Sequence, residues 1–181
     1  MTDDRVEVST IMRALDPEVF DAVWAAVGRL VPVVVEVHRL GCHRPPSSDR
    51  DCFEVMLVRL LTGCSWEDSE RLCGNEVSDT TPRERRDEWL AAGVFDAISQ
   101  QAMTAYGRVI RLDLSHVAVD RLRWPVERTN SWLSNFGQLR RNTDRRPNHR
   151  LAQLALALGF LLTAKIIDWR NRWPPRLPLI R

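Results

Sequence analysis

Lysine is almost absent from this chain of 181 residues: Lys165 is the one lysine among 26 basic residues. A coding sequence rich in G and C favours arginine codons and explains most of this bias, so arginine content alone does not predict nucleic-acid binding. The position of the charge is more informative. Up to Asp120 there are 13 basic and 21 acidic residues, a net charge of −8, whereas from Arg121 onwards there are 13 basic and 3 acidic residues, a net charge of +10. The chain is therefore acidic before one point and basic after it.

The sequence also lacks the spacing of a zinc site and the pattern of a secretory signal. No two cysteines form a C-x-x-C pair, and the loose cluster around residues 38–43 has no second ligand pair. Buried, reduced thiols are therefore the favoured interpretation of the cysteines, over zinc. The start, Met-Thr-Asp-Asp, has neither a basic region nor an apolar stretch, which predicts a cytoplasmic location. The residues concerned are His38, Cys42, His43, Cys52, Cys64 and Cys73.

A long apolar run, "LAQLALALGFLLTAKIIDW" at residues 151–169, is the one stretch that suggests a membrane span. Gln153, Thr163 and Lys165 interrupt it, so that it falls short of the ~20 clean apolar residues that a span prefers. We therefore predict a buried core helix and no membrane partner.

The first half of the chain is predicted to be helical. Residues 17–36 begin with apolar residues at helical spacing, and Pro32 interrupts the pattern. Residues 51–63 place an apolar face on a helix that stops at Gly63, a residue type that tolerates the left-handed conformation after a helix. The apolar positions are Val19, Phe20, Val23, Trp24 and Val27 in the first segment, and Phe53, Met56, Leu57, Leu60 and Leu61 in the second.

Two more short helices follow in this half. Ser65 can cap a helix that ends at Gly74, and Thr81, Pro82 and Glu84 have the spacing of an N-cap, a first helical residue and a capping box. Three short helices joined by tight glycine-containing turns are typical of a helix-turn-helix. The arginines of the third helix would then face phosphates or base edges; they are Arg83, Arg85 and Arg86. A plain helical bundle with a solvated Arg/Glu face is an equal alternative, and the acidic balance of this half counts against strong DNA affinity.

The β pattern in the chain is confined to residues 109–119. A helix over 94–106 is expected to end at Gly107, and the alternation of Ile110, Leu112 and Leu114 then predicts a strand or short hairpin. A lone strand leaves backbone donors and acceptors that need partners elsewhere.

Beyond Pro125 the pattern is helical again. Val126, Trp132 or Leu133, Phe136 and Leu139 mark an apolar face, and Glu127, Ser131, Ser134 and Gln138 mark a polar stripe. A basic patch follows, with Asp144 as its one acid, and it favours an anionic partner over a solvated loop. The arginines of this patch are Arg140, Arg141, Arg145, Arg146 and Arg150.

The segment "RLRWPVERTNSWLSNFGQLRRNTDRR", followed by an apolar helix, resembles the C-terminal signature of bacterial insertion-sequence transposases of the DDE class. The similar group is the insertion-sequence-five group within the insertion-sequence-four assemblage. The resemblance rests on Arg123, Glu127, Arg128, Thr129, Trp132 and Leu133. "LLTGCSWEDSERLCG", with the helix at 82–92 and "GVFDAI", looks like the N-terminal helical domain of the same group, and "LDLSHVAVD" looks like its first catalytic strand.

The resemblance implies a Mg²⁺-dependent phosphoryl transfer on DNA. Asp120 would be the first acid of the triad and Glu127 the last, both as metal ligands, with Asp113 as a rival for the first place. Arg123 and Arg128 would join the other arginines as DNA contacts. Two Mg²⁺ ions in such a site activate the nucleophile and stabilise the leaving oxygen, and carboxylates must bridge and flank them.

The spacing departs from the family, because six residues, Arg121 to Val126, stand where the family has the remaining strands of a ribonuclease-H-like sheet and the second catalytic Asp. An internal deletion would leave this arrangement. The expected fold is mainly α: an N-terminal helical, helix-turn-helix-like domain at 1–107, a remnant first strand at 108–120, and C-terminal helices of a truncated ribonuclease-H-like core at 121–181.

Three functions follow from these patterns. The first is a transposase-like DNA-binding protein of a bacterial insertion sequence, internally truncated and without catalysis, whose partners are transposon ends and an intact transposase relative or a second copy. The second is an active DDE transposase completed by oligomerisation. The third is a non-enzymatic helical interaction protein.

Overall fold

The computed structural model describes residues 16–33, 47–74, 77–110, 131–141 and 143–173. All regular structure within these ranges is helical, which confirms the mainly α prediction. A short helical stretch at 131–134 precedes α8. The elements are α2 (Pro17–Val27), α3 (Asp49–Thr62), α4 (Trp66–Leu72), α5 (Thr80–Ala91), α6 (Val94–Ile110), α8 (Gly137–Arg141) and α9 (Pro147–Arg172).

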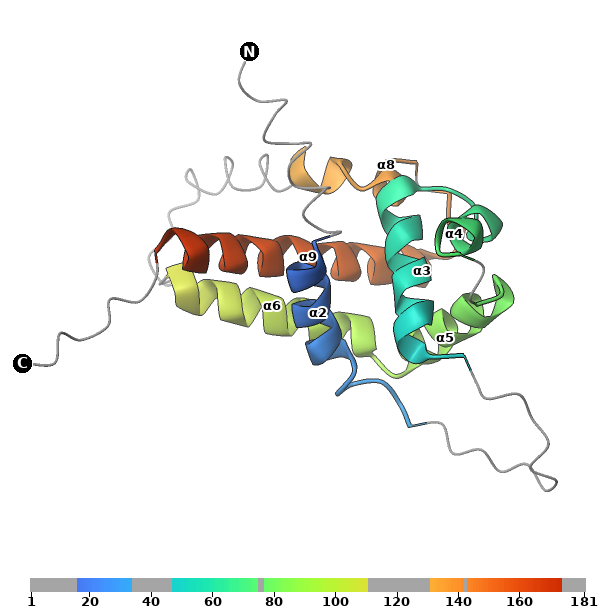
Figure 1. Cartoon of the computed structure of the whole chain (residues 1–181), viewed down its shortest axis with the longest axis horizontal. Helices are drawn as coiled ribbons and strands as arrows, with labels where there is room; N and C mark the ends of the chain where they lie inside the picture. The colour runs from blue at the N-terminus through green and yellow to red at the C-terminus, as the bar shows by residue number, and fades with distance from the viewer. Residues whose placement is uncertain (1–15, 34–46, 75–76, 111–130, 142, 174–181) are drawn as a thin grey trace, which may run out of the picture.

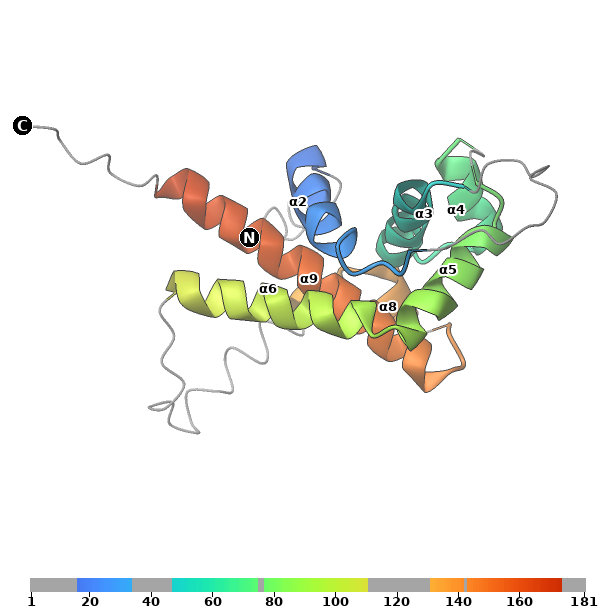
Figure 2. The same ribbon diagram turned by 90° about the horizontal axis from the view of Figure 1, so that it is seen from below.

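Helices α6 and α9 form the centre of the fold. They lie side by side and run in the same direction, while α2 crosses them (Figures 1 and 2). Helices α3 and α5 lie near the start of α9, and α4 packs on α3. Close contact between the pair depends on Gly159, because a Cβ atom there would lie 2.7 Å from Cγ2 of Ile98. The most extensive helix packing in the described structure therefore joins segments on either side of residues 111–146.

The core is one cluster centred on Phe53 of α3. The Phe53 ring stacks on Phe160 of α9 with centroids 5.8 Å apart, and its centroid lies 5.4 Å from that of Trp24 and 6.3 Å from that of Trp89. These rings come from α2, α3, α5 and α9, and burial of each of the two phenylalanine side chains contributes about 1.5–3 kcal/mol. The two halves of the described chain thus share one core. The division into domains at 107/108 and 120/121 stays a prediction.

The local signals around α3 and α4 are confirmed. The predicted apolar face of α3 is buried, and Gly63 has the left-handed φ of 69° that favours glycine after a helix. Ser65 caps α4: its Oγ accepts a hydrogen bond from the amide of Asp68 at 3.0 Å and donates one to the Asp68 carboxylate at 2.7 Å. Helix α3 packs against both α4 and α5.

The cap of α4 gives a stability prediction. Ser65→Ala removes the acceptor of the Asp68 amide and is expected to lower the free energy of unfolding by about 1 kcal/mol. Urea denaturation followed by circular dichroism measures the change. Ser65→Thr keeps a hydroxyl that can both accept from the amide and donate to the carboxylate of Asp68, and is the matched control. Equal losses in the two variants would show that the cap bond contributes nothing.

The predicted start of α5 is wrong. The helix begins at Thr80 with Asp79 as its N-cap residue, and Pro82 is buried in the first turn, so that Thr81 and Glu84 form no capping box. Tertiary contacts fix this start, because the Asp79 amide donates to Glu70 Oε2 at 2.9 Å. The connection from α4 to α5 spans residues 73–79, which is longer than the three or four residues of a helix-turn-helix turn.

The predicted end of α6 at Gly107 is also wrong. The strand predicted for residues 109–119 is wrong at residues 109 and 110, which are helical. Helix α6 continues through Gly107 to Ile110, because packing along α9 stabilises helical backbone that local propensity alone does not favour. No strand is found in the ranges that the structure describes. The rest of the predicted strand, residues 111–119, lies outside them.

The predicted single helix after Pro125 is interrupted. Residues 131–134 are helical, the chain turns at 135–136, and α8 begins at Gly137. The turn follows from a close backbone approach between Gly137 and the end of α3: a Cβ atom on Gly137 would lie 2.5 Å from the carbonyl oxygen of Thr62. Gln138, expected on a polar stripe, is fully buried as a result.

Helix α9 agrees with the prediction of a buried helix. It is long and apolar enough to cross a membrane by length and composition, and 56% of its apolar window is buried within the fold. Such burial is typical of the core helix of a soluble protein. Pro147 occupies a first-turn position, where its missing N–H costs nothing.

Candidate nucleic-acid interface

The segment from Arg140 to Arg150 combines exposed arginines with a partly buried acid. All five arginines predicted for the basic patch are exposed: Arg140, Arg141, Arg145, Arg146 and Arg150. Asp144, the one acid among them, keeps only 14% of its side chain exposed. The charge that this segment presents to solvent is therefore positive throughout its described residues, and we call residues 140–150 the basic segment.

Asp144 is held from inside the fold by side chains of three helices. Its Oδ2 lies 3.4 Å from Nη1 of Arg59 in α3 and accepts hydrogen bonds from the amides of Gln138 in α8, at 3.3 Å, and Gln153 in α9. Gln138 Nε2 also donates to Thr143 Oγ1 at 2.7 Å. These contacts join both halves of the described chain to the loop that precedes α9.

Two arginines of the basic segment also bind backbone oxygens. Arg150 Nε donates to the carbonyl of Asp144 at 2.6 Å, and Arg141 Nη1 donates to the carbonyl of Gly63 at 3.2 Å. The first bond ties the loop to the start of α9, and the second ties α8 to the α3–α4 turn. Within the described ranges, Arg145 and Arg146 form no ion pair with an acidic side chain, and both are exposed.

The arginines of α5, in contrast, are engaged in ion pairs. Arg83 pairs with Asp79, Arg85 Nε lies 3.1 Å from Asp49 Oδ1, and Arg86 Nη2 lies 2.9 Å from Asp87 Oδ1. Only 13% of the Arg85 side chain and 11% of the Arg86 side chain are exposed, against 47% for Arg83. Of the three residues predicted for a recognition helix, Arg83 is thus the one with a largely accessible guanidinium group.

The ring of Trp66, at the start of α4, contacts arginines of α3 and α5. Its ring lies 4.7 Å from the guanidinium carbon of Arg59, 5.2 Å from that of Arg86 and 6.0 Å from that of Arg83. Burial lowers the pKa of Arg59, and the neighbouring Asp144 carboxylate opposes that shift. Cation–π contacts of this kind stabilise guanidinium groups that have lost water.

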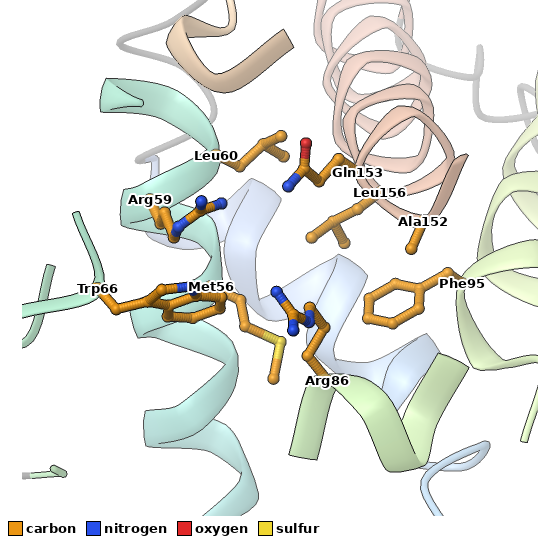
Figure 3. A pocket seen from close by; sticks show the side chains of 9 residues that line it. All are labelled: Met56, Arg59, Leu60, Trp66, Arg86, Phe95, Ala152, Gln153 and Leu156. Carbon is orange, nitrogen blue, oxygen red and sulfur yellow. The ribbon is translucent and has the colours of Figure 1, made fainter. Parts of the chain in front are cut away.

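A cavity of about 20 Å³ lies beside Trp66 (Figure 3). In the close-up, Arg59 and Met56 from α3 face Gln153 and Leu156 from α9 across it. This volume suits about one water molecule, whereas sites for small organic ligands are roughly 300–1,000 Å³. The cavity is a gap in packing and does not suggest a substrate pocket. Its lining residues are Met56, Arg59, Leu60, Trp66, Arg86, Phe95, Ala152, Gln153 and Leu156.

A larger open groove of about 710 Å³ lies where α5 and α6 meet the start of α9. His149 spans this junction, with Nε2 3.1 Å from Asp87 Oδ1. Burial and the charge of Arg86 lower the pKa of His149, so its neutral form is favoured. Two acids, Asp87 and Asp96, line the groove together with Arg146 of the basic segment, so the charge of the groove does not by itself favour a phosphate.

Several predicted site residues lie outside the described ranges. Asp113, Asp120, Arg123, Glu127 and Arg128 are in this class, and so is the cluster of His38, Cys42 and His43. The described residues hold no group of three His, Cys, Asp or Glu side chains able to bind a metal ion.

Three of the cysteines are described, and all of them are free thiols: Cys52, Cys64 and Cys73. Burial raises the pKa of Cys52 to about 11 and that of Cys73 to about 11. Both thiols are therefore protonated at neutral pH. Cys52 is buried as predicted, whereas Cys64 and Cys73 are only partly buried.

Comparison with known proteins decides the family. A sequence profile described as "Putative transposase of IS4/5 family" matches residues 19–99. The "Insertion element IS402 uncharacterized 16.2 kDa protein" of Burkholderia cepacia is 32% identical over 106 residues, which cover 58% of this chain and 70% of that protein. The chain belongs to the IS4/5 transposase family. No solved structure matches it significantly.

The IS4/5 profile covers α2 to α5 and the start of α6, so it includes Arg59 and Trp66 but not the basic segment. The resemblance stated from the sequence is thereby confirmed at the level of the family. Sequence reasoning found the arginines of the basic segment through their clustering. It missed Asp144 as an anchor, since nothing local distinguishes a buried acid in "NTDRR" from a solvated one.

Proposed function

We propose that this IS4/5 family member binds DNA through the exposed arginines of its basic segment. The main support for this proposal is the arrangement around Asp144. The acid faces inward to Arg59, while the arginines on either side of it are exposed. A phosphate backbone fits this arrangement, because guanidinium groups bind phosphate oxygens in a planar, bidentate fashion. Transposon ends are the expected target, and a bacterial cytoplasm is the expected location.

The surface favours the basic segment over α5 as the DNA contact. Arg85 and Arg86 would have to leave their ion pairs with Asp49 and Asp87 to reach a phosphate. The exposed acids Glu84, Asp87 and Glu88 of α5 would repel it. The helix-turn-helix-like unit then serves mainly as the support of the basic segment, through Arg59 and the α3–α4 turn.

We further propose that the chain does not cleave DNA by itself. Mg²⁺ is the cofactor that the family implies. Two-metal phosphoryl transfer needs several carboxylates, and only six residues separate Asp120 from Glu127 in the sequence. Both of these acids lie outside the described ranges. Mg²⁺-dependent nicking of an end-containing DNA, lost in a Glu127→Ala variant, would favour the alternative of an active enzyme completed by oligomerisation.

Paired arginine substitutions test the DNA contact. Replacing Arg145 and Arg146 together by alanine is expected to weaken binding to a short fluorescein-labelled duplex by about tenfold at low salt. The slope of log K against log salt should fall by about 1.8, because each phosphate contact contributes about 0.9. Fluorescence anisotropy over a salt series measures both quantities.

Arg83→Ala is the matched control for this experiment, since it removes one exposed arginine from α5. Its effect on affinity should be smaller than half that of the paired variant. A larger effect of Arg83→Ala would place the interface on α5 instead. If the unmodified protein binds no duplex even at low salt, the non-enzymatic helical interaction protein becomes the better description.

A further inference from the structure

We infer that Asp144 is a positioning residue that holds Arg145 and Arg146 in place for phosphate binding. This inference rests on the proposed function, because it concerns the same basic segment. Asp144 itself would not touch the DNA. Its carboxylate is directed into the fold, where it contacts Arg59 of α3, Gln138 of α8 and Gln153 of α9.

The loop between α8 and α9, which contains Asp144, is also held by hydrogen bonds to its backbone and to Thr143. The Asp144 carbonyl accepts a hydrogen bond from Arg150 Nε at 2.6 Å, while the neighbouring Thr143 hydroxyl accepts one from Gln138 Nε2 at 2.7 Å. Arg145 and Arg146 immediately follow this anchored residue. A loop held in this way loses little conformational freedom when its arginines bind a ligand, and such preorganisation raises affinity.

The partner of the carboxylate also explains how an acid can sit within a DNA-binding segment. An exposed carboxylate beside two arginines would neutralise part of their charge and repel phosphate. Here the Arg59 side chain, 9% exposed, compensates the Asp144 charge inside the fold. The Asp144 carboxylate therefore offsets less of the positive charge that Arg145 and Arg146 present to an external anion.

Substitution of Asp144 by asparagine separates positioning from simple electrostatics. Asp144→Asn removes a negative charge, so a purely electrostatic role predicts tighter DNA binding in the variant. Loss of the anchor predicts the opposite, a binding constant about five- to tenfold weaker, because the loop backbone that carries the two arginines must then be ordered on binding. The probe is the same labelled duplex, measured by anisotropy over a salt series.

A second variant keeps the test valid if the unpaired Arg59 charge prevents folding. Arg59→Met combined with Asp144→Asn has the net charge of the unmodified protein and leaves no buried charge without a partner. It should also bind several-fold more weakly. Val23→Ala, in a buried position of α2 remote from the basic segment, is the control for a general loss of stability and should leave affinity unchanged.

The outcomes distinguish this inference from the proposed function. If the unmodified protein binds DNA and the paired Arg145 and Arg146 variant does not, but the Asp144 variants bind equally well or more tightly, Asp144 has no positioning role. If Val23→Ala weakens binding as much as the Asp144 variants do, their effect is one of stability alone. If neither the arginine nor the aspartate variants change binding, the proposed function fails first.

Discussion

Asp144→Ala is expected to lower the free energy of unfolding by about 3–5 kcal/mol, because it leaves the Arg59 guanidinium buried without its counter-charge. At the same time the Gln153 amide loses its acceptor, and the Gln138 amide keeps only the Thr143 hydroxyl. A buried donor without a partner costs about 1–3 kcal/mol by itself, so the larger figure is reached if Gln153 finds no new acceptor. Urea denaturation monitored by circular dichroism at 222 nm, a standard helix wavelength, measures the change in unfolding free energy.

The double variant Arg59→Met and Asp144→Ala is the control for this prediction. Removing both charges of a buried pair costs far less than removing one, so the double variant should be more stable than Asp144→Ala alone. Arg59 Nε and Gln138 Oε1 are buried without a hydrogen-bond partner, which makes the network a good candidate for apolar replacement. If the double variant is the less stable of the two, the ion pair is not the main contribution of Asp144.

Gly137→Ala is expected to destabilise the fold by about 3 kcal/mol, at the upper end of the usual cost of overpacking. The added Cβ atom would lie 2.5 Å from the carbonyl oxygen of Thr62 and 2.8 Å from that of Leu61. Both atoms belong to the backbone, so no side-chain rotation relieves the overlap, and α8 must move away from α3. The melting temperature and the urea midpoint should both fall.

Gly107→Ala is the matched substitution in α6, where a Cβ atom would meet nothing within 4 Å. Because alanine is the better helix former, this variant should gain about 0.5–1 kcal/mol. The two glycines thus predict changes of opposite sign for the same chemical replacement. A loss of stability in both variants would mean that the contact between α3 and α8 is not what makes Gly137 necessary.

Local patterns predicted the elements whose ends depend on nearby residues. The apolar face of α3, its stop at Gly63 and the Ser65 cap of α4 each follow from side chains within a few positions of one another. The same holds for α9, whose burial was expected from its continuous apolar sequence. These signals are short-range, so the sequence contains all the information that they need.

The errors occur where distant contacts decide the structure. The start of α5 depends on the bond between the Asp79 amide and Glu70, and the length of α6 depends on its packing against α9. The break before α8 depends on a backbone contact between Gly137 and Thr62. Each partner lies far away in the sequence or in a position that no periodic pattern marks.

The candidate interface was predicted in part, because the sequence shows which arginines cluster but not which of them are exposed. Clustering identified the basic segment, but the availability of a given arginine depends on its partners in space. Arg83, Arg85 and Arg86 look equivalent in the sequence, yet Arg85 and Arg86 are largely covered in the structure. Whether Asp144 opposes or supports the neighbouring arginines depended on Arg59, which lies 85 positions earlier in the chain.

The pairing of α6 with α9 also determines when this protein can fold during its synthesis. A ribosome releases the chain from its N-terminus, so α2 to α6 emerge before the helix that covers Ile98 and Phe53. Until α9 follows, their apolar faces remain exposed to water and to neighbouring nascent chains. The last described helix therefore covers apolar faces that the earlier helices have already presented to solvent during synthesis.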